Sequence, residues 1–172
     1  PKPQNPKSMK NQKLSKPFSH FVQYLYLTIL NSINNSILIQ TDDNKIFSKN
    51  DFRIVSKEKP SKLQFENLVF AFNICRFVKS NAIVLANNKS TIGIGSGQPS
   101  RVDSCQIAID KMRKYINTKN EIVAASDAFF PFVDSIEKLV QSGVSAIVQP
   151  SGSIRDKEII QFANSTGTIL AF

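Results

Sequence analysis

Two segments of the chain carry the residue types that could bind a ligand. One is the glycine-rich run Gly93–Arg101, and the other is Ser126–Phe132, which places three phenylalanines and a proline beside a Ser-Asp pair. The second run fits neither the alternation of a strand nor the spacing of a helix face. Aromatic rings in a proline-containing loop, near a glycine-rich turn, are typical of a site for a flat ligand with an anionic end.

The glycine-rich run allows two interpretations. It lacks the spacing of the dinucleotide fingerprint, but a turn from a strand into a helix directs free N–H groups and the positive helix end toward an anion. Alternatively, the glycines serve only a backbone with positive φ. Gln98 and Arg101, close to the helix start, favour the binding interpretation. Arg101 could offer two parallel donors to a carboxylate, a phosphate or a developing oxyanion.

Further candidates lie where predicted strands and helices end. Ser151-Gly152-Ser153 precedes a predicted helix, and it could bind an anion or simply begin that helix. Asp127 could accept hydrogen bonds from a ligand amide, join a cation site or order its own loop, and Asp134 is predicted as the N-cap of the next helix. Asn81 could close the chain locally or present a donor and an acceptor to a ligand.

Cysteine and histidine usage does not indicate a zinc site. Cys75 and Cys105 lie in predicted helices, without a second Cys or a His at metal-ligand spacing. We therefore predict buried, reduced thiols. The single histidine, His20, is interpreted as an ordinary polar residue.

The candidate residues must be positioned by helices and strands, and the clearest pattern begins at Ser61. Ser61 and Gln64 form a predicted capping box for a helix that ends near Lys79. The turn 87–90 predicts a hairpin between strands 81–86 and 91–95. The rest alternates: helix 100–115, strand 122–125, helix 134–142 with Gly143 after it, strand 145–149, helix 156–164 and strand 168–172.

The alternation of strands and helices predicts an α/β fold whose last strands are parallel. Loops after Gly95, Ser126 and Pro150 would then gather at one edge of the sheet, where such folds bind ligands. Before residue 60 the pattern is weaker. It predicts a short helix or buried strand at 21–30 and strands at 37–40 and 53–55.

Composition places limits on the function. The chain has 172 residues, 41% of them hydrophobic and 20% charged, with a net charge of +9. Residues 1–16 hold five lysines and no acid, which leaves 9 − 5 = +4 for the remainder. Because later basic residues are scattered among acids, we predict no nucleic-acid partner. No apolar run could span a membrane and no signal peptide is evident, so we predict no membrane partner and a cytosolic protein.

Four long segments closely resemble the aminoimidazole carboxamide ribonucleotide (AICAR) transformylase domain of the bifunctional purine biosynthesis protein, whose other domain is IMP cyclohydrolase: 77–84, 92–101, 126–134 and 149–156. The resemblance covers residues 37–172 and leaves 1–36 as a poorly matched arm and entry segment. It implies a cytidine deaminase-like three-layer α/β/α fold. This chain would be the C-terminal one of two similar halves, truncated before its final strand.

The resemblance also implies an activity, in which the formyl group of 10-formyltetrahydrofolate is transferred to the 5-amino group of AICAR. Asn81 would contact the amine and formyl region, and Arg101 with the backbone around Phe129 would stabilise the oxyanion. Asp127 would belong to a potassium site, and the enzyme would be a homodimer. The implied substrate- and folate-binding residues are Gln98, Phe129, Pro131, Phe132, Asp134, Ser151, Gly152 and Ser153.

The chain departs from the family at several points. The Lys-His pair that handles proton transfer in the family does not occur in these 172 residues, and none of their segments resembles the cyclohydrolase domain. Val133 stands where relatives often carry arginine, and Asn34-Asn35 where they often carry two glycines. The alternative function is therefore a catalytically incomplete nucleotide- or folate-binding fragment without activity of its own.

Overall fold

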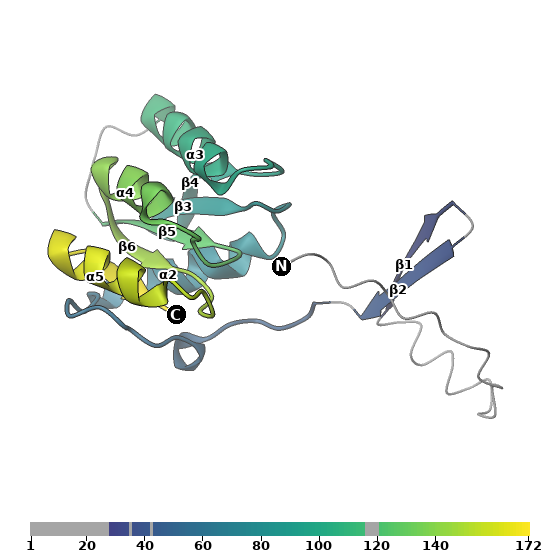
Figure 1. Ribbon diagram of the computed structural model, residues 1–172, viewed down its shortest axis with the longest axis horizontal. Coiled ribbons are helices and arrows are strands. Elements are labelled where there is room, and N and C mark those ends of the chain that lie inside the picture. Colours follow the sequence, from purple (N-terminus) through teal and green to yellow (C-terminus); the bar gives the residue numbers. More distant parts are fainter. Residues whose placement is uncertain (1–27, 35, 42, 116–120) are drawn as a thin grey trace. The chain divides into compact units, whose positions relative to one another are not determined.

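The computed structural model describes residues 28–34, 36–41, 43–115 and 121–172. The chain divides into two units, residues 1–44 and 45–172. Figure 1 shows the helices and strands of both units. Most of the predicted arm at 1–36, and His20 with it, lies outside the described residues.

The first unit contains a hairpin of two antiparallel strands, β1 (Thr28–Ile33) and β2 (Ser36–Thr41), paired from Thr28↔Thr41 to Ile33↔Ser36. Asn34 adopts a positive φ of 52° in the turn, a conformation that glycine adopts more readily. The predicted strand at 37–40 is confirmed. Within 21–30, residues 21–27 are not described, and the end that is described is an exposed strand rather than a helix or buried strand.

The second unit is built on a five-stranded mixed sheet in the order β4-β3-β5-β6-β7. Strand β3 is antiparallel to both of its neighbours, whereas β5, β6 and β7 are parallel, as predicted. The elements in chain order are η1 (Lys49–Asp51), α2 (Lys62–Cys75), β3 (Ile83–Asn87), β4 (Ser90–Gly95), α3 (Arg101–Tyr115), β5 (Ile122–Ser126), α4 (Val133–Gln141), β6 (Val144–Val148), α5 (Asp156–Thr166) and β7 (Ile169–Ala171).

Helices cover both faces of this sheet, because alternate residues of each buried strand point to opposite sides. On one face α2 packs through Leu68, Ala71 and Cys75 against strand residues such as Val84 and Val148. On the other face α3, α4 and α5 pack against residues such as Leu85. The predicted three-layer α/β/α architecture is thus confirmed; the finer likeness to cytidine deaminase stays a prediction.

The sequence predicted the start of α2 correctly but not its end. The capping box is present, since Gln64 N–H donates to Ser61 Oγ at 3.0 Å and Ser61 N–H donates to Gln64 Oε1 at 2.9 Å. The helix ends at Cys75 rather than near Lys79. The predicted strand at 53–55 is reduced to a single bridge between Ile54 and Ala171, beside the end of β7.

Both cysteines are free and buried, as predicted. They lie on opposite sides of the sheet, Cys75 in the α2 layer and Cys105 in the α3 layer. Burial raises the pKa of each thiol to about 12. Neither is therefore a thiolate near neutral pH, and neither is a candidate nucleophile.

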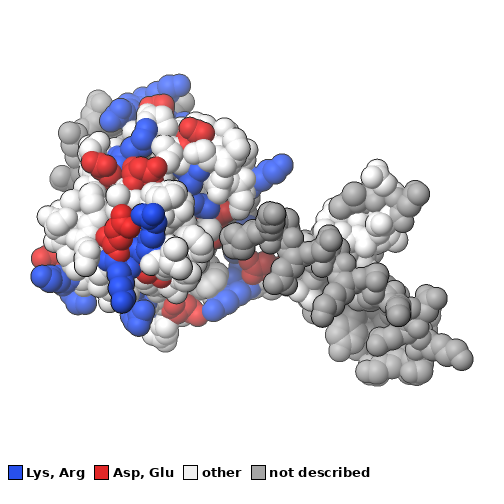
Figure 2. Space-filling model, viewed as in Figure 1, with Lys and Arg blue, Asp and Glu red and all other residues white. Residues whose placement is uncertain are grey.

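On the face seen in Figure 2, positive and negative side chains of the second unit are interspersed. The ion pairs of this unit include the partly buried Lys89–Glu66 pair at 2.9 Å and the exposed Arg155–Glu158 pair at 3.0 Å. Within the described ranges, no helix is long and apolar enough to cross a membrane.

Candidate active site at one edge of the sheet

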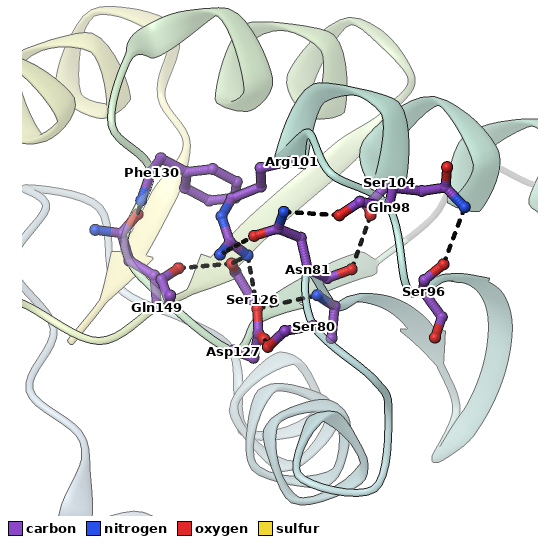
Figure 3. A network of polar contacts seen from close by, with 12 residues as sticks. Ser80, Asn81, Ser96, Gln98, Arg101, Ser104, Ser126, Asp127, Phe130 and Gln149 are labelled. Carbon is purple, nitrogen blue, oxygen red and sulfur yellow. Dashed lines mark hydrogen bonds and ion pairs between the residues drawn. The ribbon is translucent and has the colours of Figure 1, made fainter. Parts of the chain in front are cut away.

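Three segments meet at one edge of the sheet because of its strand register. Ile83, at the start of β3, pairs with Gly95 at the end of β4 and with Ser126 at the end of β5. The residues before β3, after β4 and after β5 therefore converge there. Figure 3 shows the polar network that they form with the first turn of α3.

Arg101 is at the centre of this network. Its Nη1 donates to Asp127 Oδ1 at 2.6 Å and to Ser126 Oγ at 2.8 Å, while Nη2 donates to Asn81 Oδ1 at 2.8 Å. Its side chain is only 9% exposed, so the ion pair with Asp127 is screened by little water. The guanidinium thus fixes three groups from two other segments at once (Figure 3).

Asn81 is held on all sides. Its Nδ2 donates to the carbonyl oxygen of Gln98 at 2.9 Å, and its own carbonyl oxygen accepts from Ser104 Oγ at 2.8 Å. The peptide bond between Ser80 and Asn81 is cis. These contacts support the interpretation that Asn81 closes the chain locally, since its Nδ2 donates to Gln98 O and its Oδ1 accepts from Arg101. Its presentation of a donor and an acceptor to a ligand stays a prediction.

Asp127 has contacts typical of a carboxylate that orders a loop. Oδ1 accepts from Ala82 N–H at 3.0 Å as well as from Arg101, and Oδ2 accepts from the Ser80 hydroxyl. Burial alone would raise the pKa of Asp127, but these hydrogen bonds and the positive charge of Arg101 outweigh it and hold the pKa below its usual value.

The potassium ion that the resemblance implies at Asp127 stays a prediction, and the contacts of this carboxylate do not favour it. Both carboxylate oxygens already accept hydrogen bonds, and the guanidinium of Arg101 would repel a second cation. Across the described part of the chain, no group of three or more His, Cys, Asp or Glu residues could hold a metal ion.

The lowered pKa of Asp127 predicts how stability depends on pH. The unfolded carboxyl titrates at about 3.9. Because the folded pKa is lower, the stabilisation by ionised Asp127 is present above about pH 4 and is lost as the pH falls through the folded value. In urea unfolding, the advantage of the wild type over Asp127→Asn should therefore shrink steadily below pH 4. A constant difference between pH 7 and pH 2 would contradict this assignment.

The glycines serve two different purposes. Gly93 and Gly95 lie within β4, and a Cβ there would be 2.1 Å from Ala108 O and 1.9 Å from Ser104 O. They allow α3 to pack closely against β4. Only Gly97 among the three has positive φ, at 68°, and its N–H donates to Lys79 O at 2.9 Å. The glycine run thus allows the close packing that positions Arg101, at the start of α3, in the site. The Gly97 N–H already has an acceptor and is not free to bind an anion.

The aromatic loop divides its phenylalanines between the core and the surface. Phe130 is buried and belongs to the core beneath α3, α4 and α5. Phe132 is 51% exposed, and the Arg155 guanidinium lies 4.7 Å from its ring centre. Pro131 is exposed and Phe129 is half-buried. Only part of the run can therefore contact a ligand.

Asp134 is not the N-cap of α4, which corrects the prediction. The cap position is occupied by Phe132, and Asp134 lies in the first turn, where its Oδ1 accepts from Ser135 N–H at 2.6 Å. A carboxylate in the first turn still interacts favourably with the helix dipole. An acid before an apolar run correctly predicted that a helix begins here. The predicted N-cap, however, lies two residues after the observed one.

The loop after β6 lies at the same edge, since β6 is parallel to β5. Ser151 and Gly152 are exposed there, and Gly152 N–H donates to Asp156 Oδ2 at 2.8 Å. Contacts link this loop to the aromatic loop through Arg155 and Phe132, and through Gln149 and Phe130. Asn81, Gln98, Arg101 and Asp127 form one hydrogen-bonded group. Phe132 and Ser151–Ser153 follow β5 and β6 at the same edge of the sheet, and no hydrogen bond joins them to this group among the described residues.

Sequence reasoning assigned no role of their own to four polar residues of the site, although Ser126 stood in the Ser-Asp pair of the aromatic run: Ser80, Ser104, Ser126 and Gln149. Ser104 could have been found, because it follows Arg101 by three residues and so lies on the same helix face. Gln149 could have been suspected from its position directly after a buried strand. Ser80 and Ser126 carried no signal beyond adjacency to Asn81 and Asp127.

The family described as "AICARFT/IMPCHase bienzyme" matches residues 18–111, more than half of the chain. Similar curated relatives are each called bifunctional purine biosynthesis protein PurH. That of Leptospira biflexa is 43% identical over 156 residues, 91% of this chain and 30% of the relative. That of Buchnera aphidicola is 46% identical over 143 residues, covering 83% and 27%. The chain thus spans about 30% of the length of these relatives. It belongs to the AICARFT/IMPCHase bienzyme family.

Proposed function

We propose that this chain contributes part of a formyltransferase site, in which the 5-amino group of AICAR attacks the formyl carbon of 10-formyltetrahydrofolate. The observation that carries the proposal is the Asn81–Arg101–Asp127 group beside the aromatic loop, in a chain of this family. Purine biosynthesis is what the names of the relatives state. The formyl transfer itself is our proposal for this chain.

In the proposed reaction the amine nitrogen forms a bond to the formyl carbon, and the carbonyl electrons move onto the formyl oxygen. Arg101 and the Phe129 N–H stabilise the resulting oxyanion. Collapse breaks the bond to N10 of the folate, which leaves with a proton that originates from the amine. Asn81, fixed by Arg101 and Gln98, orients the amine.

The folate is proposed to lie over the exposed part of the two loops. Phe132 and Pro131 offer apolar surface, and the exposed Ser151-Gly152 turn offers hydroxyl and backbone groups. Asp134 is exposed beside them and can accept hydrogen bonds from a pterin amine. The half-buried Phe129 precedes this surface in the same loop, two residues after Asp127, which Arg101 contacts. The proposed enzyme acts as a homodimer, as the resemblance implies.

One observation favours the second candidate, a binding fragment without turnover. The titratable groups in the described network are Arg101 and Asp127, and they are paired with each other. The lowered pKa of Asp127 leaves it ionised and paired at neutral pH, where it is a poor proton acceptor, and a guanidinium offers no acceptor atom. We propose that the proton acceptor comes from another part of the longer protein.

Titration calorimetry tests the proposal. We expect the chain to bind AICAR and 10-formylfolate, and to bind neither RNA nor DNA of similar charge. Turnover should appear only when the remaining parts of a longer relative are added. Binding without restored turnover would favour the second candidate, and binding of nucleic acid alone would contradict both.

A further inference from the structure

Gln149 is a buried amide that the proposed function does not use. It follows β6 directly, its side chain is fully buried, and its main-chain N–H donates to Ala171 O at 3.1 Å. Its Oε1 accepts from Phe130 N–H at 3.1 Å (Figure 3). Its Nε2 is buried and has no hydrogen-bond partner among the described residues. A buried amide whose N–H donors lack a hydrogen-bond partner lowers the free energy of unfolding. A residue that carries this cost calls for an explanation, such as a functional role.

The bond from Gln149 fixes one peptide plane of the aromatic loop. The Phe130 N–H belongs to the peptide group between residues 129 and 130, and the Phe130 ring is anchored in the core. The preceding peptide group is also fixed, because Ser126 Oγ donates to Ala128 O at 2.6 Å. Ser126 Oγ in turn accepts from Arg101. Two consecutive peptide planes are therefore held, one by Gln149 and one by Ser126.

This arrangement determines where the Phe129 N–H points. In a trans peptide the N–H lies opposite the carbonyl oxygen. Since Ala128 O is held toward Ser126 Oγ, the Phe129 N–H is directed to the other side. No acceptor for this N–H occurs among the described residues. It is a donor without a partner in the loop that Arg101 contacts through the Ser126 hydroxyl.

We propose that Gln149 is a positioning residue for formyl recognition: by holding the Phe130 amide it orients the neighbouring Phe129 N–H toward the formyl oxygen. The inference rests on the proposed function. Gln149 does not touch the reacting atoms. It ties the loop after β6 to the loop after β5, so that the two loops that would contact the folate keep one geometry.

The chain offers a matched control in Asn67. This residue is also a fully buried amide, its Oδ1 accepts from a loop N–H, that of Lys89 at 2.8 Å, and its Nδ2 also has no partner among the described residues. It holds the turn between β3 and β4, at the opposite end of the sheet from Ser126. Loss of either amide removes the same kind of bond, but only one of them lies at the site.

The test compares Gln149→Met with Asn67→Leu in the full chain. Affinities for 10-formylfolate and for folate are measured by calorimetry, and amide exchange at Phe130 by NMR. We expect Gln149→Met to speed exchange at Phe130 at least tenfold and to reduce the preference for the formylated compound at least tenfold. Its folate affinity should change less than twofold, and Asn67→Leu should leave both the exchange and the preference unchanged. If Gln149→Met does not fold, Gln149→Asn, one methylene shorter, should give the same loss.

The outcomes separate the two proposals. If the wild-type chain binds neither compound, the proposed function fails and the role of Gln149 fails with it. If the wild type prefers 10-formylfolate and Gln149→Met keeps that preference, only the role of Gln149 is overturned. An equal loss of preference in Asn67→Leu would also overturn it, because general loosening would then explain the effect.

Discussion

Replacing Arg101 with alanine should lower the free energy of unfolding by about 3 kcal/mol and reduce turnover of the complete enzyme at least tenfold. The stability loss follows because Asp127, whose side chain is 15% exposed, would keep its charge without its partner. Asn81 Oδ1 and Ser126 Oγ would lose a charged donor as well. The tenfold loss of turnover corresponds to about 1.4 kcal/mol in the barrier.

Arg113 provides the control for this substitution. It lies on the same helix, α3, and is exposed. Arg113→Ala should change stability by less than about 0.5 kcal/mol and leave turnover at the wild-type level. Urea unfolding and a formyl-transfer assay measure both quantities. Wild-type turnover in Arg101→Ala would refute its role in the oxyanion site.

A second substitution separates the two roles of Arg101. Arg101→Lys keeps a positive charge near Asp127 but cannot reach Asn81, Ser126 and Asp127 together, because an ammonium lacks the guanidinium fork. We expect a smaller stability loss than in Arg101→Ala, with a comparable loss of turnover. If lysine restored turnover fully, charge alone would be sufficient and the orientation of Asn81 by Arg101 would not matter.

The sequence predicted the elements that depend on local or periodic signals. The α2 capping box, the hairpin turn before β4 and the parallel order of the last strands all follow from residues within one element or its flanks. The predicted cap at Asp134 failed for a similar local reason. A carboxylate is favourable both at the cap and within the first turn, and the residue type does not distinguish the two.

The site was predicted as separate candidates and not as a network. Arg101 contacts Asn81 and Asp127, which lie 20 and 26 residues away from it in the sequence. The residue types alone do not indicate that these side chains contact one another. Likewise, an aromatic run does not reveal which ring enters the core. Phe130 does so and Phe132 does not, because the sheet and α4 fix their directions. The sequence also did not indicate that Gln149 accepts a hydrogen bond from the Phe130 N–H of the aromatic loop, because this contact depends on the fold.

The glycine run carries the second large effect, and it connects packing to function. We expect Gly95→Ala to lower the free energy of unfolding by at least about 3 kcal/mol. Its Cβ would lie 1.9 Å from Ser104 O and 2.8 Å from Ser104 Cα, and both atoms are backbone that cannot rotate away. The start of α3 would have to move. Arg101 and the bond from Ser104 Oγ to Asn81 O would move with it.

Gly167→Ala is the matched control, because it adds the same methyl group where no atom lies within 4 Å. Its cost is the positive φ of 68°, about 1–2 kcal/mol. Urea unfolding should rank Gly95→Ala well below Gly167→Ala, and only Gly95→Ala should lose affinity for AICAR beyond its loss of folded protein. Equal stability of the two variants would mean that α3 can withdraw from β4 at little cost. The close approach of helix and strand would then not be what holds Arg101 beside Asn81.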